Sequence, residues 1–265
     1  MNVSPQKIAA FRRFLLSWYD KNKRDLPWRN TTDPYKILVS EVMLQQTQVD
    51  RVLPKYRTFL ETFPTVEALA KASPADVLKA WSGLGYNRRA LYVQQAAQQI
   101  LEQRTFPQTA EELQQLPGIG AYTSCSILIF AFNADEVAID TNIRRILIHQ
   151  FALPEDAGQE ELLFLAKKLL PPGKSRDWHN ALMDYGATVL TSKQSGIRPL
   201  SRQSRFQGSR RQYRGAVLKK LVAGKKLTIK ELSKVWQKEK RWVEELLGEM
   251  EEEGLLRVRK GKVFL

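Results

Sequence analysis

Apolar residues recur at helical spacing along most of the first 170 residues of the chain. From Gln6 to Leu170 they return every three or four positions, as at Ile8, Phe11 and Leu15, with interruptions at proline and glycine. An α-helix repeats every 3.6 residues, so this spacing predicts a succession of amphipathic helices. We therefore expect an all-α fold for this part of the chain.

Two of the predicted helices have marked starting points. The segment Ser73–Asp76 places Pro74 at the first helical position, where its fixed φ and missing N–H do no harm. Thr109 is followed three residues later by Glu112, the spacing of a capping box. We expect helices to begin close to both sites.

A different pattern begins near residue 190. The segment from Thr191 to Gln212 contains six basic residues and no acidic one, and it is rich in Ser, Gln and Gly, which is typical of an irregular connection. Beyond it the sequence predicts three helices, over Arg214–Ala223, from Thr228 onward, and over Lys240–Glu253.

The last residues predict a hairpin. Apolar and basic residues alternate around Lys260-Gly261, which is a turn signal. Three helices followed by a hairpin is the order of a winged helix, a variant of the helix-turn-helix. A small dimerisation or capping domain is the alternative, because Glu249 and residues 251–253 put negative charge near the end of the third helix.

Length and composition are those of a globular protein with one large body and a small appendage. The chain has 265 residues, of which 43% are hydrophobic and 26% charged. Cys125 is the only cysteine, which excludes an internal disulfide and an all-cysteine metal cluster and favours a reducing compartment. The start of the chain does not resemble a secretory signal, and the longest apolar run, Ile127 to Phe132, is too short to span a bilayer. We expect a soluble cytoplasmic protein.

The net charge of +14 is concentrated in the C-terminal part of the chain. Residues 190–265 contain 20 basic and 8 acidic side chains, so most of the excess positive charge lies there. Such an asymmetry favours a polyanionic partner, a nucleic acid or a membrane surface, although a basic surface can also serve solubility alone.

A glycine-containing turn and two carboxylates are the candidate functional groups of the chain. Gly118 and Gly120 flank Ile119 between two predicted helices, where bare backbone amides can bind phosphate; an ordinary helix connection would look similar. Glu41 lies in an otherwise apolar helical face and Asp140 follows the apolar stretch Val137 to Ile139, and such surroundings raise the pKa of a carboxyl group toward the value needed by a general acid. The structural alternatives are a helix-capping aspartate and a glutamate neutralised by a buried arginine.

Seven blocks of residues, in order along about 70% of the chain, resemble the helix-hairpin-helix (HhH-GPD) DNA glycosylases, and within them the MutY adenine glycosylases. They are Leu26-Pro27-Trp28-Arg29, Pro34-Tyr35-Lys36, SEVMLQQTQV at 40–49, Gly83-Leu84-Gly85-Tyr86, Leu116 to Gly120, Asp140-x-Asn142, and Ala181 to Ala187. The run at 40–49 is long and highly specific.

The resemblance implies an active site. Glu41 would protonate the flipped adenine at N7, and Asp140 would stabilise the positive charge that develops on the deoxyribose. Tyr122 and Asn142 would organise that charge and the water. Related bifunctional enzymes of the endonuclease III kind carry a lysine nucleophile where this chain has Tyr122, so the resemblance implies a monofunctional enzyme that leaves an abasic site.

The resemblance also implies DNA contacts. Gln46 would fill the gap left by the extruded nucleotide, and Tyr86 would wedge beside the opposing base. The remaining predicted DNA-binding residues are Gly118, Gly120, Gln45, Thr47, Trp28, Arg29 and Lys193.

The chain departs from the family in two places. Many members hold an iron–sulfur cluster with cysteines spaced C-x6-C-x2-C-x5-C, and here the same spacing falls on Leu190, Ile197, Leu200 and Phe206. We expect no cofactor or metal, and a hydrophobic plug of these four residues in place of the cluster. Nothing after Tyr213 resembles the domain that inspects 8-oxoguanine in full-length relatives.

Taken together, the residues and the resemblance predict a two-lobed all-α glycosylase. One lobe is expected at residues 26–135, the other at 1–25 and 136–208 with the chemistry in a cleft between the two, and a winged-helix-like domain at 209–265. The expected partner is duplex DNA carrying adenine opposite guanine or 8-oxoguanine, with no membrane partner. We expect a monomer associated with a bacterial or archaeal nucleoid, whose product passes to abasic-site processing enzymes. A thymine glycosylase acting on T·G mismatches and a non-catalytic DNA-binding regulator are the alternatives.

Overall fold

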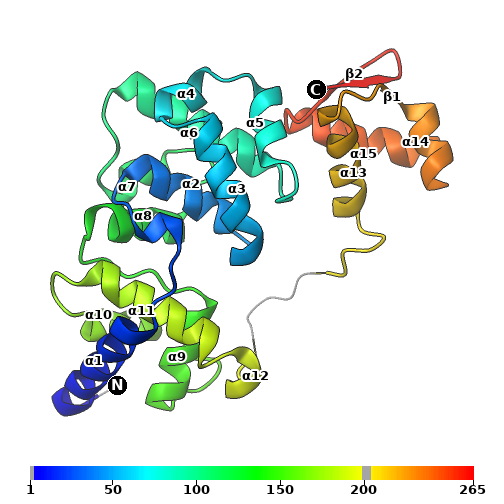
Figure 1. Ribbon diagram of the computed structural model, residues 1–265. Helices are drawn as coiled ribbons and strands as arrows, with labels where there is room; N and C mark the ends of the chain where they lie inside the picture. Colours follow the sequence, from blue (N-terminus) through cyan, green and yellow to red (C-terminus); the bar gives the residue numbers. More distant parts are fainter. Residues whose placement is uncertain (1–2, 199–203) are drawn as a thin grey trace. The chain divides into compact units, whose positions relative to one another are not determined.

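The computed structural model describes residues 3–198 and 204–265, and it is mainly helical (Figure 1). Two compact units are present. Unit 1 comprises Met1–Glu41, Pro107–Gln115 and Ile119–Arg202, and unit 2 comprises Val42–Phe106, Leu116–Gly118 and Gln203–Leu265. These units divide the chain at other places than the expected lobes, whose boundaries stay a prediction. No helix in the described ranges is long and apolar enough to cross a membrane.

Unit 1 is built from helices around one apolar core. Its elements are α1 (Pro5–Asn22), the 3₁₀ turn η1 (Pro27–Arg29), α2 (Pro34–Leu44) as far as Glu41, α7 (Ala110–Gln114), α8 (Ala121–Phe132), α9 (Thr141–Phe151), α10 (Gln159–Leu169), α11 (Ser175–Thr188) and α12 (Ser192–Ser195). The core lies among α1, α9, α10 and α11. Phe11 of α1 meets the rings of Phe151 and Trp178 edge to face, at centroid distances of 5.4 and 5.7 Å. The apolar residues at helical spacing therefore lie on helix faces that pack into the core.

The N-terminal part of unit 2 holds four helices. They are α3 (Val49–Thr62), α4 (Val66–Lys71), α5 (Pro74–Trp81) and α6 (Arg88–Gln103). The predicted helix starts are confirmed in both units: Ser73 caps α5, with the Ser73 hydroxyl accepting from the Asp76 amide at 3.1 Å, and Thr109 and Glu112 form the capping box of α7.

The C-terminal part of unit 2 is a winged helix. Helices α13 (Arg210–Val222), α14 (Ile229–Trp236) and α15 (Lys240–Glu252) are followed by the hairpin β2 (Arg257–Arg259) and β3 (Lys262–Phe264). The predicted helices and hairpin are confirmed, and α13 begins at Arg210, earlier than expected. A two-residue strand, β1 (Leu227–Thr228), pairs with β3 to give the sheet order β1-β3-β2, which the alternation pattern did not predict because β1 is too short.

Acidic residues of α15 are engaged within this domain. Arg210 donates to Glu249 at 2.9 Å, and Arg214 forms ion pairs with Glu249 and Glu253. Two of the four carboxylates that favoured a dimerisation or capping domain, Glu249 and Glu253, thus connect α13 to the end of α15.

The four residues of the expected hydrophobic plug are described only in part. Leu190 and Ile197 are buried in the core of unit 1, at 7% and 8% exposure. Phe206 belongs to unit 2 and is 60% exposed, and Leu200 lies outside the described residues, so the plug of four residues stays a prediction.

Candidate active site

Glu41 is a buried carboxyl group on α2. The run Ile37 to Met43 is fully or almost fully buried, and Glu41 itself is 9% exposed. Burial raises the pKa of Glu41 to about 7; a hydrogen bond with Ser126 lowers it and the charge of Asp140 raises it. Among the described residues no arginine or lysine forms an ion pair with Glu41, so a neutralising buried arginine is not the reason for its position.

Asp140 stands at the start of α9, directly after the extended segment that ends at Ile139. Its Oδ1 accepts from the Ile143 amide at 2.7 Å, and its Oδ2 accepts from the Asn142 Nδ2 at 2.9 Å. Burial raises the pKa of Asp140, and these hydrogen bonds oppose the rise. Asp140 is therefore a helix cap, as the structural alternative held, and it is also the charged neighbour of Glu41.

Tyr122 lies in the first turn of α8, two residues after Gly120. Burial raises the pKa of its hydroxyl well above 10.0, and the charges of Glu41 and Asp140 add to the rise. The ring remains 37% exposed. The structure thus brings Glu41, Asp140, Tyr122 and Asn142 into one neighbourhood of unit 1, which we call the carboxylate site. Residues a hundred positions apart meet here because α2, α8 and the start of α9 are parts of one packed unit.

Asn142 is held by a second set of contacts that the sequence did not indicate. Its Oδ1 accepts from Arg145 Nη2 at 2.6 Å, and Arg145 also donates to the carbonyls of Gly186 and Leu190 at 2.6 and 2.7 Å. A Cβ at Gly186 would lie 2.7 Å from the Asn142 Cβ, so only glycine lets α11 approach α9 this closely. Arg145 and Gly186 therefore fix the residue that donates to Asp140.

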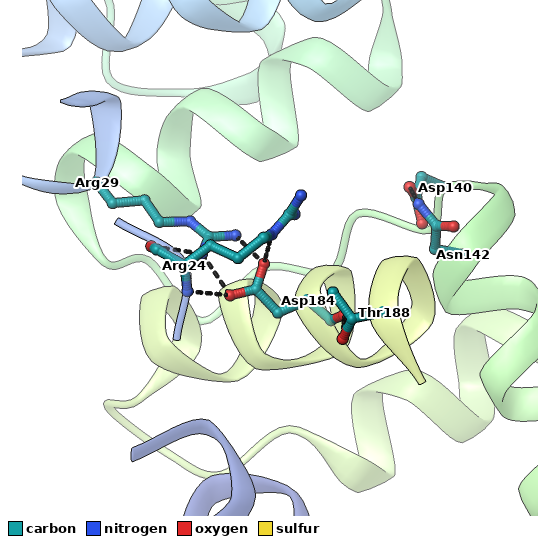
Figure 2. Close-up of polar contacts among 6 residues, drawn as sticks. All are labelled: Arg24, Arg29, Asp140, Asn142, Asp184 and Thr188. Atoms are coloured by element: carbon teal, nitrogen blue, oxygen red, sulfur yellow. Dashed lines mark hydrogen bonds and ion pairs between the residues drawn. The ribbon is translucent and has the colours of Figure 1, made fainter. Parts of the chain in front are cut away.

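Asp184 is a fully buried carboxylate on α11 with two arginine partners (Figure 2). It accepts from Arg24 Nε at 2.5 Å and from the Arg29 Nη1 and Nη2 at 2.5 and 2.7 Å. Burial alone would raise the pKa of Asp184, but the hydrogen bonds from Arg29 and Arg24 hold it below its ordinary value. Arg29 is therefore occupied inside unit 1, and Trp28 is 7% exposed. The assignment of Trp28 and Arg29 to DNA binding stays a prediction.

The predicted phosphate turn contains one glycine with a strict backbone requirement. Gly118 has φ +78°, and a Cβ there would lie 2.8 Å from the Tyr92 ring, so both conformation and packing demand glycine. Gly120 has φ −98° and leads into α8 with open space around it. Gln45 Nε2 donates to the Gly118 carbonyl at 3.4 Å. The amides at the start of α8 are those that the sequence assigned to phosphate.

In unit 2, the two residues predicted to act on the DNA stack both lie in left-handed turns. Gln46 has φ 53° and Tyr86 has φ 48°. Such conformations are strained for non-glycine residues and concentrate at functional sites. Gln46 is exposed and Tyr86 is 37% exposed, so both side chains are accessible. Lys193, on α12 of unit 1, is exposed as well.

Arg89 of α6 connects these two turns, and sequence reasoning missed it. The buried Arg89 guanidinium donates hydrogen bonds to five backbone carbonyls and to the Thr47 Oγ1, which lies at 3.0 Å. The carbonyls are those of Val42 (2.7 Å), Met43 (3.0 Å), Gln45 (2.5 Å), Gly85 (3.1 Å) and Tyr86 (3.3 Å). Burial lowers the pKa of Arg89 to about 10, which still leaves it charged at neutral pH. Arg89 is a positioning residue for both turns.

The residues at the cluster spacing do not fit an iron–sulfur cluster. Leu190, Ile197, Leu200 and Phe206 have no thiolate or imidazole to offer. Within residues 3–198 and 204–265, no group of three or more His, Cys, Asp or Glu side chains is placed to hold a metal. The expectation of no cofactor stays a prediction.

Known proteins resemble the chain in sequence and in structure. Residues 39–172 match the model of the HhH-GPD superfamily of base excision DNA repair proteins. An adenine DNA glycosylase of Mycolicibacterium smegmatis is 39% identical over 241 residues, which cover 82% of this chain and 80% of the relative. The adenine DNA glycosylase of Homo sapiens is 40% identical over 212 residues, covering 74% of this chain and 38% of the relative.

The chain thus spans about two fifths of the length of its human relative. Among solved structures, a thermostable thymine-DNA glycosylase is similar with a TM-score of 0.66 and 28% identity, over 70% of this chain and 88% of that one. The match to the family model covers half of the chain, and the sequence relatives extend it to most of the remainder. The chain therefore belongs to the HhH-GPD superfamily of base excision DNA repair proteins.

Proposed function

We propose that the chain is a monofunctional adenine DNA glycosylase, which hydrolyses the bond between adenine and deoxyribose in mispaired duplex DNA. The observation that carries this proposal is the carboxylate site, where a glutamic acid with a pKa near 7 lies beside an aspartate. The relatives named adenine DNA glycosylase support the choice of adenine.

Glu41 is the proton donor in this proposal. With a pKa of about 7, roughly half of the Glu41 side chains carry a proton at neutral pH and can donate it. Protonation of adenine at N7 makes the base a better leaving group, because the electron pair of the C1′–N9 bond departs with it. Asp140 then faces the positive charge left on the sugar, and water attacks C1′ and loses a proton.

Asn142 and Tyr122 complete the site. The Asn142 amide donates to Asp140 and, held by Arg145, fixes the orientation of that carboxylate. Tyr122 keeps its proton because its pKa is raised, so it serves as a hydrogen-bond donor and not as a nucleophile. Water is therefore the nucleophile, and the product is an abasic site for enzymes that process such sites.

DNA binding uses residues of both units, each in its own role. Gln46 and Tyr86 replace the stacking of the extruded adenine, while the amides at Gly118 and Gly120 bind a phosphate. Gln45 and Thr47 hold the turn around Gln46, since Gln45 bonds to Gly118 and Thr47 to Arg89. The basic winged helix adds affinity for duplex DNA of any sequence.

Excision of thymine from T·G mismatches is the second candidate, supported by the 28% identity to a thymine-DNA glycosylase. Single-turnover reactions on duplexes containing A·8-oxoguanine, A·G or T·G, followed by alkaline cleavage and gel analysis, separate the two. The proposal expects release of adenine but not of thymine, and thymine release alone would assign the second function. Borohydride trapping should give no covalent adduct.

The experiment has a matched catalytic control. Asp140→Asn keeps the shape of the helix cap but removes the anion, so the rate of adenine release should fall by several orders of magnitude while DNA binding is retained. A wild-type chain that binds these duplexes but releases no base from any of them would identify a DNA-binding regulator instead.

A further inference from the structure

A hollow in unit 2 is lined both by the turn at Tyr86 and by residues of the winged helix. It has a volume of about 380 Å³, and its wall includes Gln46, Tyr86 and Arg89 together with Arg211 and Arg214 of α13. We call it the Tyr86 pocket. Its volume is within the range of ligand sites, and an aromatic ring, amides and guanidinium groups are the side chains that recognise nucleotides. Two residues of the wall, Gln46 and Tyr86, have the strained backbone described above.

Arg211 is the link between the winged helix and this turn. Its Nη1 donates to the Tyr86 hydroxyl at 2.8 Å, and its guanidinium carbon lies 5.9 Å from the centre of the Tyr86 ring. Its Nη2 donates to the backbone carbonyl and the hydroxyl of Ser204, at 2.6 and 3.1 Å. An arginine has five N–H donors, so three are used here.

Two of the three other arginines in the wall of the pocket are committed elsewhere, and the third, Arg88, lies over the Tyr92 ring, 5.0 Å from its centre. Arg89 donates hydrogen bonds to backbone carbonyls of the turns at Gln46 and Tyr86. Arg214 pairs with Glu249 and Glu253 and thereby fixes α13 against α15. Arg211 is the arginine that donates to the Tyr86 hydroxyl, so its remaining N–H donors lie beside the ring that faces the opposing base, and the ion pairs of α13 hold it in position.

We propose that Arg211 is a specificity-determining residue that reads the purine opposite the excised base. This rests on the proposed function, in which Tyr86 wedges beside that opposing base. Guanine presents two acceptors in the groove, O6 and N7, and 8-oxoguanine retains O6, whereas cytosine presents an amino donor at the corresponding edge. The N–H groups of Arg211 match the first two bases and not cytosine. The winged helix thus takes part in reading the mismatch, besides adding general affinity.

The test compares two arginine variants of the full chain. Arg211→Ala removes the proposed contact, and Arg241→Ala removes the same charge from α15 at a side chain that is 87% exposed and outside the pocket. Single-turnover rates are measured on duplexes with adenine opposite guanine and opposite cytosine. Binding is measured in an Asp140→Asn background, where the duplex stays intact.

Wild type and Arg241→Ala should prefer guanine over cytosine by the same factor. Arg211→Ala should reduce that preference about tenfold or more, since one good arginine–guanine contact supplies discrimination of this size. An unchanged preference would overturn the proposal. A uniform loss of binding to both duplexes would overturn it as well, because that is the behaviour of a phosphate contact. Failure of the proposed function is a separate outcome: wild type would then release no adenine from either duplex.

Discussion

Replacing Glu41 by glutamine should make the protein more stable at neutral pH while abolishing adenine release. Glu41 is almost fully buried, and burial raises its pKa from 4.5 to about 7. The folded state therefore binds the Glu41 proton more tightly than the unfolded state does. Glutamine has nearly the same shape and no proton to lose, so it removes the cost of keeping this group buried.

The pH dependence of stability follows from the pKa of Glu41 in the unfolded state, 4.5, and in the folded state, about 7. Because the pKa is raised in the folded state, the stability from proton binding is fully present below pH 4.5 and is lost as the pH rises to about 7. A shift of this size corresponds to about 3 kcal/mol of unfolding free energy. Glu41→Gln should match the wild type at pH 4 and exceed it by about 3 kcal/mol at pH 8.

Urea denaturation followed by circular dichroism at several pH values measures this difference. Glu61→Gln is the matched control, because Glu61 is exposed on α3 and its replacement should change the unfolding free energy by no more than about 0.5 kcal/mol. A Glu41→Gln variant that is less stable than wild type at pH 8, or whose advantage does not vary with pH, would show that the carboxyl group is not held at a raised pKa.

Three other predictions concern the residues that support the site. Gly186→Ala should lower the single-turnover rate about tenfold and destabilise the fold by about 1–3 kcal/mol, because the new Cβ would press on Asn142, whereas Gly215→Ala, with open space around it, should do neither. Arg89→Lys keeps the charge but loses most of the carbonyl contacts, so unfolding free energy should fall by about 2 kcal/mol and gel-shift affinity for mismatched DNA should weaken. Asp184→Asn leaves the part-buried Arg24 and Arg29 without their buried carboxylate, and calorimetry should show a loss of about 3–5 kcal/mol.

The central residues of the carboxylate site could be predicted from the sequence because their chemistry is local. Glu41 lies in an apolar helical face, Asp140 follows an apolar stretch, and the family blocks around them are specific. The winged helix could be predicted for a similar reason: capping residues, helical spacing and the turn at Lys260-Gly261 act over a few positions.

The supporting arginines could not be predicted in this way. Arg89 and Arg145 donate to backbone carbonyls from distant parts of the chain. Every residue has such a carbonyl, so the sequence does not indicate which ones accept these bonds. An arginine in a family block is equally consistent with a phosphate contact and with a buried carboxylate, so the sequence alone does not predict the bond between Arg29 and Asp184. Only the fold, which brings Asp184 to it, distinguishes the two.

The dependence of adenine release on pH tests the central claim most directly. If Glu41 donates the proton, the single-turnover rate on a duplex with adenine opposite guanine should fall tenfold per pH unit above about pH 7, as the donor loses its proton. A rate that stays constant from pH 6 to pH 9 would contradict the assignment of Glu41 as the acid.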